Sequence, residues 1–135
     1  MQGQHSGAVR KLRRARYMDF KSLLQKIVEN VDGAMGASVI GEDGIAIDQF
    51  SAKSDFDITA AGAEYSTIIS AAKKASQSFG LGKTNEVLIS TEKATMIMMI
   101  AGKNYFVTLA LSLDGNLGRG RLELKKAIPE LEKLL

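Results

Sequence analysis

Apolar residues recur at three- and four-residue intervals near the start of the chain, which is the spacing of an amphipathic helix. Asp19 is placed to cap this helix, and Gly33 ends it. The β-rich runs 37–40 and 45–50 follow, separated by a turn whose Asp43-Gly44 pair supplies the positive φ angle that hairpins need. This part of the chain therefore predicts a helix and a hairpin. The apolar stripe of the helix consists of Phe20, Leu23, Leu24, Ile27, Val28 and Val31.

The remainder of the chain predicts a long helix, three strands and a last helix. Asp57 is placed to cap a helix over 58–79, which Phe79-Gly80 closes. Only two or three residues separate the next three β-rich runs, so these runs predict an antiparallel meander. They are 86–91, 94–101 and 105–112. Pro129 should kink or break the last helix, whose stripe is Leu117, Leu124, Ile128, Leu131 and Leu135.

Two of these strands indicate that the sheet is covered on both faces. Residues 96–100 are apolar without alternation and 106–111 nearly so, whereas a sheet with one wet face alternates polar and apolar positions. We therefore predict an α/β (α+β) fold of order α-β-β-α-β-β-β-α, with a central five-stranded antiparallel sheet and helices on both faces. The middle helix should lie on one face and the two terminal helices on the other. Its sheet-facing stripe is Ala61, Tyr65, Ile68, Ala72, Ala75 and Phe79.

The positive charge is concentrated at the start of the chain. Residues 1–17 contain five basic residues and no acid, which leaves 13 basic against 15 acidic residues in 18–135, a net charge of −2. Clustered basic residues can bind phosphates. We nevertheless interpret 1–17 as a flexible leader or as residues upstream of a natural start at Met18, and 18–135 as one domain, so nucleic acid is an unlikely partner. The five basic residues are Arg10, Lys11, Arg13, Arg14 and Arg16.

The composition excludes the commonest catalytic and metal sites. The 135 residues include no cysteine, and the one histidine is His5 in the leader, so thiol nucleophiles, zinc ribbons and a Ser-His relay are all absent. The absence of cysteine fits a reducing compartment, and no apolar run approaches the roughly 20 residues that span a bilayer. We expect a soluble cytoplasmic protein that is not an enzyme and has no catalytic residue, metal or cofactor.

Several short motifs have structural explanations that we prefer. Gly82-Lys83-Thr84 matches the end of a P-loop, but residue 77 is Gln77 rather than glycine, and a predicted helix precedes while a strand follows. The glycine cluster 115–120 is better explained as a tight strand-to-helix turn than as an anion site. Neighbouring acids are explained by turns and caps, and strand methionines by core packing. The acids are Glu42, Asp43, Asp55 and Asp57, and the methionines are Met96, Met98 and Met99.

Short side chains follow one flank of the middle helix and allow a second helix to approach closely. Alanine also favours helices without any partner, so this flank is ambiguous by itself. The strand Glu86-Val87-Leu88-Ile89-Ser90 is a predicted sheet edge without proline or an inward lysine, the usual protections against pairing with another chain. Together these features favour a homodimer with one two-fold interface. The expected interface residues are Ala60, Ala63, Ala71, Val87 and Ile89, and the flank also includes Thr67, Lys74 and Ser78.

The order of elements and two sequence stretches resemble the Roadblock family of dynein light-chain-related proteins. The stretches are residues 36–45, GASVIGEDGI, and 116–126, NLGRGRLELKK. The resemblance extends from Asp19 to Leu134 and implies a homodimer whose partners are small Ras-like GTPases or, in eukaryotes, motor complexes. Relatives of the bacterial and archaeal type act on a GTPase without inserting an arginine. This agrees with the chain, since Arg119 and Arg121 are the only arginines from Met18 onward.

From this resemblance we expect a non-enzymatic homodimer that binds a Ras-like GTPase and biases its switch loops. The outer part of the middle helix and the following loop should bury against the GTPase. The expected contact residues are Glu64, Thr67, Lys74, Ser78 and Lys83. Two alternatives stay open, namely a passive scaffold and a small-ligand sensor with a pocket between helix and sheet.

Overall fold

The structure is a computed structural model that describes residues 20–53 and 56–135. The order of elements is the predicted one. An N-terminal helix (20–29) precedes β1 (Ala34–Gly41), β2 (Ala46–Ser51), α2 (Gly62–Ser78), β3 (Glu86–Ser90), β4 (Ala94–Ala101), β5 (Tyr105–Ser112) and α3 (Leu117–Leu134). The predicted leader 1–17, its boundary at Met18 and the predicted cap Asp19 lie outside the described residues, as does Asp55.

The strands form one antiparallel sheet in the order β2-β1-β5-β4-β3. β3 therefore lies at an edge, as predicted, and among the described strands it pairs with β4 alone. The antiparallel pairing of β1 with β2 confirms the predicted hairpin, and Gly44 in its turn has a φ angle of +88°. Gly33, which ends the first helix, has a φ angle of +81°. The two glycines thus adopt the left-handed conformation that other residues rarely adopt.

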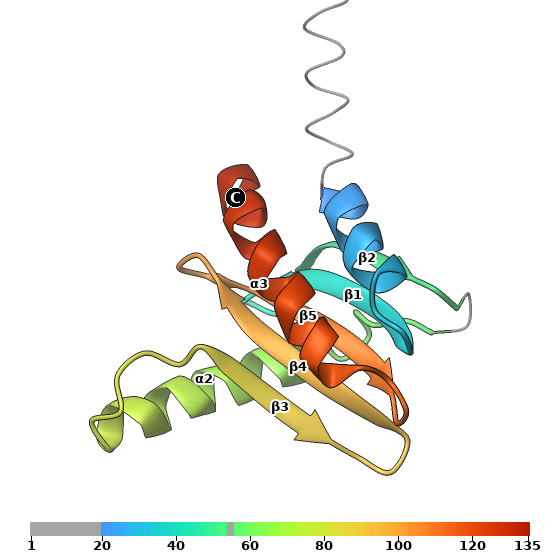
Figure 1. Ribbon diagram of the computed structural model, residues 1–135. Helices are drawn as coiled ribbons and strands as arrows, with labels where there is room; N and C mark the ends of the chain where they lie inside the picture. The colour runs from blue at the N-terminus through green and yellow to red at the C-terminus, as the bar shows by residue number, and fades with distance from the viewer. Residues whose placement is uncertain (1–19, 54–55) are drawn as a thin grey trace, which may run out of the picture.

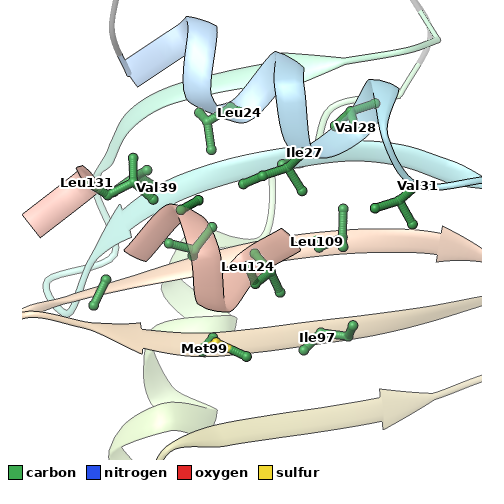
Figure 2. Close-up of a cluster of buried hydrophobic side chains, with 14 of the residues drawn as sticks. Leu24, Ile27, Val28, Val31, Val39, Ile97, Met99, Leu109, Leu124 and Leu131 are labelled. Carbon is green, nitrogen blue, oxygen red and sulfur yellow. The ribbon is translucent and has the colours of Figure 1, made fainter. Parts of the chain in front are cut away.

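Helices cover both faces of the sheet (Figure 1). The N-terminal helix and α3 lie side by side over one face, where they bury a large apolar cluster that includes Leu24, Leu124 and Leu131 (Figure 2). α2 covers the other face, where Ile69 packs with Met98 and other strand residues. Consecutive residues of β4 enter opposite clusters, which explains its unbroken apolar run and confirms the predicted layers.

The start of α2 differs from the prediction. The helix begins at Gly62 rather than at residue 58, and its N-cap, Ala61, makes no side-chain hydrogen bond. Asp57 instead caps the preceding turn, where its Oδ1 accepts hydrogen bonds from the Thr59 N–H at 2.9 Å and the Thr59 hydroxyl at 2.7 Å. These bonds lower the pKa of the Asp57 carboxyl. The turn places Ile58 in the core, which a continuous helix from Asp57 would not require.

The structure corrects two further helical predictions, namely the packing of Phe79 on the sheet and a break of the last helix at Pro129. Phe79 is 80% exposed rather than packed on the sheet, because α2 makes its closest approach through Gly62, Ser66 and Ile69, and this face is rotated by about one residue from the predicted stripe. α3 continues through Pro129 without a break. Pro129 has no N–H group to donate to the carbonyl of Lys125. Pro129 and Lys125 are both exposed, so water can reach that carbonyl.

The turn between β1 and β2 holds the start of α2 very closely. A Cβ atom at Gly62 would lie 2.6 Å from the carbonyl oxygen of Gly44, so only glycine fits this contact. The Ser66 hydroxyl donates a hydrogen bond to the carbonyl of Glu42, and the Lys73 ammonium forms an ion pair with the Glu42 carboxylate. The hairpin turn therefore fixes where the helix starts and how it is rotated.

A polar row crosses the sheet beneath α2. Gln49, Ser38 and Thr108 are cross-strand neighbours on β2, β1 and β5. Ser38 and Thr108 are fully buried, and the side-chain oxygens of all three residues lack a hydrogen-bond partner among the described residues. A buried hydroxyl without a partner destabilises the folded state by about 1–3 kcal/mol. The row is therefore a weak point in the core beneath α2.

Replacing Thr108 with valine should raise the free energy of unfolding by about 1 kcal/mol, because valine keeps the shape and removes the unpaired hydroxyl. Denaturant titration measures the change. Thr95→Val is the control, since Thr95 is a half-buried strand residue outside this row. An unchanged or lower stability for Thr108→Val would mean that the hydroxyl is satisfied.

Replacing Gly62 with alanine should lower the free energy of unfolding by about 2 kcal/mol or more, because the new Cβ collides with the backbone of Gly44. The matched control is Gly118→Ala in α3, where the nearest atom to an added Cβ lies at 3.7 Å. That change should be neutral or stabilising by up to about 1 kcal/mol. Equal melting temperatures for the two variants would contradict the close contact.

Candidate protein-binding surface

α2 leaves most of its surface uncovered. Only Gly62, Ser66 and Ile69 are buried among its 17 residues, and Ile69 is the one large side chain of the three. Tyr65 and Ile68 are half-buried and pack beside it. Burial raises the pKa of the Tyr65 hydroxyl. A helix that contacts its own domain along one narrow side has a wide face available for another molecule.

The predicted contact residues lie on that exposed face or next to it. The exposed side chains of α2 are Ala63, Glu64, Thr67, Ser70, Ala71, Lys74, Ala75, Gln77 and Ser78. Ala60 is also exposed, but it lies in the turn before the helix, and Lys83 is exposed in the loop after it. The structure thus brings the expected partner residues and the expected alanines together on one surface, which we call the outer α2 face.

The edge strand β3 follows α2 along the chain and packs in the same cluster as Ile69. Val87 and Ile89 are half-buried, and their side chains pack against the cluster beneath α2. They therefore serve the core of their own chain, and only the outer edge of their backbone is free to pair. Leu88 points to the opposite face and is 41% exposed. An edge strand of this kind can accept a strand from a second chain.

Sequence reasoning missed an apolar pair at the end of α2. Phe79 and Leu81 are 80% and 76% exposed, and Gly80 and Gly82, with φ angles of +67° and +83°, alternate with them. Large exposed apolar side chains are common in binding surfaces. Helical periodicity assigned Phe79 to the core, and Leu81 was read only as part of a loop. No local pattern distinguishes an apolar residue that packs within its chain from one that remains exposed.

The short motifs have the expected structural roles. α2 precedes Gly82-Lys83-Thr84 and β3 follows, so this segment lacks the helix N-terminus of a P-loop. Asp43 Oδ1 accepts a hydrogen bond from the Ile45 N–H at 3.0 Å within the hairpin turn. Asn116 caps α3 through the Arg119 N–H at 3.0 Å, which confirms the strand-to-helix turn. Met96, Met98 and Met99 are buried in the core, as predicted.

Candidate chemical groups are engaged in ion pairs. Arg119 lies 2.9 Å from Glu123, and Arg121 lies 2.9 Å from Glu86. Glu123 is only 3% exposed and also pairs with Lys126. Within residues 20–53 and 56–135, no cluster of three or more histidine or acidic residues could hold a metal ion. No helix in the same part of the chain is long and apolar enough to span a bilayer.

Comparisons with known proteins agree with this architecture. The structure of MglC from Myxococcus xanthus is 33% identical in sequence, covers 87% of this chain and 100% of that chain, and has a TM-score of 0.63. MglB from Thermus thermophilus is 18% identical with a TM-score of 0.79, and covers 89% of this chain and 90% of that one. Profilin IB from Acanthamoeba castellanii shares the fold alone. It is 11% identical with a TM-score of 0.60, and covers 84% of this chain and 97% of that one. No curated protein matches the sequence.

A family model is the most direct of these comparisons. The Roadblock/LC7 domain model matches residues 21–110, which is more than half of the chain. This segment extends from the N-terminal helix through α2 to Ala110 in β5. By this match and by its fold, the chain belongs to the Roadblock/LC7 family.

Proposed function

We propose that the protein is a non-enzymatic homodimer that binds a small Ras-like GTPase and modulates its nucleotide cycle in the cytoplasm. The observation that carries the proposal is the outer α2 face, which is exposed along the whole helix, in a domain whose sheet ends at the edge strand β3. Family membership supports a regulatory role, and so does the similarity to MglC, which is 33% identical over 87% of this chain.

The proposed dimer uses the two features together. A two-fold axis that crosses the outer α2 face near Ala71 sets two copies of α2 antiparallel, and the short side chains of Ala63 and Ala71 allow close approach. The same axis pairs the two β3 edges into one continuous sheet through backbone hydrogen bonds. One solved MglB structure is described as having a tetrameric arrangement, so this fold can self-assemble.

The proposed GTPase contact uses the polar part of the same face. Glu64, Ser78 and Lys83 lie toward the ends of α2 and in the loop after it, while Thr67 and Lys74 lie between them. The two arginines of the domain are held by Glu123 and Glu86, so we do not assign either one to the catalytic site of a GTPase. The regulator would instead act by binding one switch-loop conformation better than the other.

Replacing Ala71 with arginine should dissociate the dimer, because a long charged side chain would be buried at the two-fold axis without a partner. Light scattering at tens of micromolar should give twice the mass of the chain for the native protein and the mass of one chain for the variant. Ser22→Arg is the control, since Ser22 is an exposed helical residue on the other side of the sheet. A native protein that is monomeric at this concentration would contradict the proposed dimer.

Reversing the charge of Lys74 with Lys74→Glu should weaken GTPase binding by about 1 kcal/mol, or about fivefold in Kd. The GTPase is one that co-purifies from the native cell, and affinity and nucleotide hydrolysis are measured with purified proteins. Lys125→Glu in α3 is the matched control, because Lys125 is also exposed but lies on the opposite side of the sheet.

Two outcomes would count against this assignment. Unchanged affinity together with unchanged hydrolysis in Lys74→Glu would remove Lys74 from the contact. Tight binding of the native protein with no change in nucleotide hydrolysis or exchange would favour the passive scaffold over the regulator.

A further inference from the structure

A cavity of about 370 Å³ opens beside the C-terminal half of α2. Its walls come from three segments that are distant in sequence, namely α2 itself, the loop between α2 and β3, and the end of β4 with the turn that follows it. Each segment contributes one lysine, and these are Lys73, Lys83 and Lys103. We call this cavity the lysine pocket. It is formed within one chain and does not depend on a dimer.

The lysine pocket has an excess of positive charge. Lys73 forms an ion pair with Glu42, whereas Lys83 and Lys103 have no acidic partner within 4.0 Å among the described residues. Like charges around one cavity repel each other, and a bound anion would relieve that repulsion. Neutralising the two uncommitted lysines requires a ligand with at least two negative charges.

The backbone of the pocket adds hydrogen-bond donors. The N–H groups of Gly82, Lys83 and Thr84 donate to no other residue in the described part of the chain, although the Thr84 hydroxyl donates to Ser76 Oγ at 3.0 Å. Gly82 and Gly102 both have positive φ angles and open space within 4 Å of where a Cβ would lie. The free N–H groups therefore lie on the α2–β3 side of the pocket, whereas on the other side the Gly102 N–H donates to Glu132 Oε1 at 3.1 Å.

We propose that the lysine pocket binds a phosphate-bearing anion of at least two negative charges, such as a pyrophosphate group. Lysine binds phosphate as a point charge, and peptide N–H groups add directional hydrogen bonds to its oxygens. The pocket differs from a P-loop, since no helix begins after Gly82-Lys83-Thr84 and the lysines supply the charge. Its volume lies within the range typical of small-molecule sites and exceeds what one phosphate needs.

The pyrophosphate can be free or can belong to a nucleoside diphosphate. Ile100 forms an apolar part of the wall, which could contact a nucleoside but offers nothing to inorganic pyrophosphate. Comparing the two compounds identifies the source. Equal affinity would assign recognition to the phosphates alone, and tighter binding of the nucleotide would add the apolar wall. Both results support the anion site.

The test is a titration of the full chain with inorganic pyrophosphate, followed by the backbone amide resonances of Gly82 and Gly102. Both resonances should shift and saturate, and the affinity should fall as salt is added. The basic residues at 10–16 also attract anions, so a signal resolved at these two glycines is needed. No shift at either glycine would overturn the proposal.

The double variant K83Q/K103Q should weaken pyrophosphate binding at this site by about tenfold or more, because it removes both uncommitted charges. The matched control is K93Q/K125Q, which removes two exposed lysines elsewhere on the chain. Thermal melting of both variants checks that they fold. An equal loss of affinity in the two double variants would show non-specific attraction to charge and would also overturn the proposal.

Discussion

The contact between the β1–β2 turn and the first turn of α2 positions the rest of the functional surface. Gly44 and Gly62 approach so closely that a Cβ atom at Gly62 would lie 2.6 Å from the Gly44 carbonyl oxygen. Glu42 then holds the helix farther along, through Ser66 by its carbonyl and through Lys73 by its carboxylate. A short turn with several polar contacts therefore positions α2, whereas a broad apolar interface positions the helices on the other face.

This mode of attachment explains why α2 can serve a second molecule. The N-terminal helix and α3 bury large side chains against the sheet and against each other, so their apolar faces are satisfied within the chain. α2 is held chiefly at one end and along one narrow side, and its outer face is left with alanine, short polar and charged residues. Exposing such a face to water in a single chain costs little free energy, and its short side chains still permit close packing when another helix approaches.

The same geometry places two different kinds of surface at the C-terminal end of α2. Phe79 and Leu81 form an exposed apolar pair, whereas Lys73, Lys83 and Lys103 surround a charged cavity nearby. The Glu42–Lys73 ion pair belongs both to the attachment of α2 and to the wall of the lysine pocket. A change at the hairpin turn would therefore reach the pocket as well as the position of the helix.

The sequence alone determined the strands, their order along the chain, the layers and the edge position of β3. These features depend on local turn residues such as Gly44 and on apolar periods that are continuous over five or more residues. The polar contacts could not be predicted, because Ser66 and Lys73 are ordinary helix residues until Glu42, more than twenty positions away, is brought beside them. The exposure of Phe79, the start of α2 and the grouping of three lysines were likewise decided by tertiary structure. Each depends on which distant segment lies opposite, and that information is not present in any local pattern.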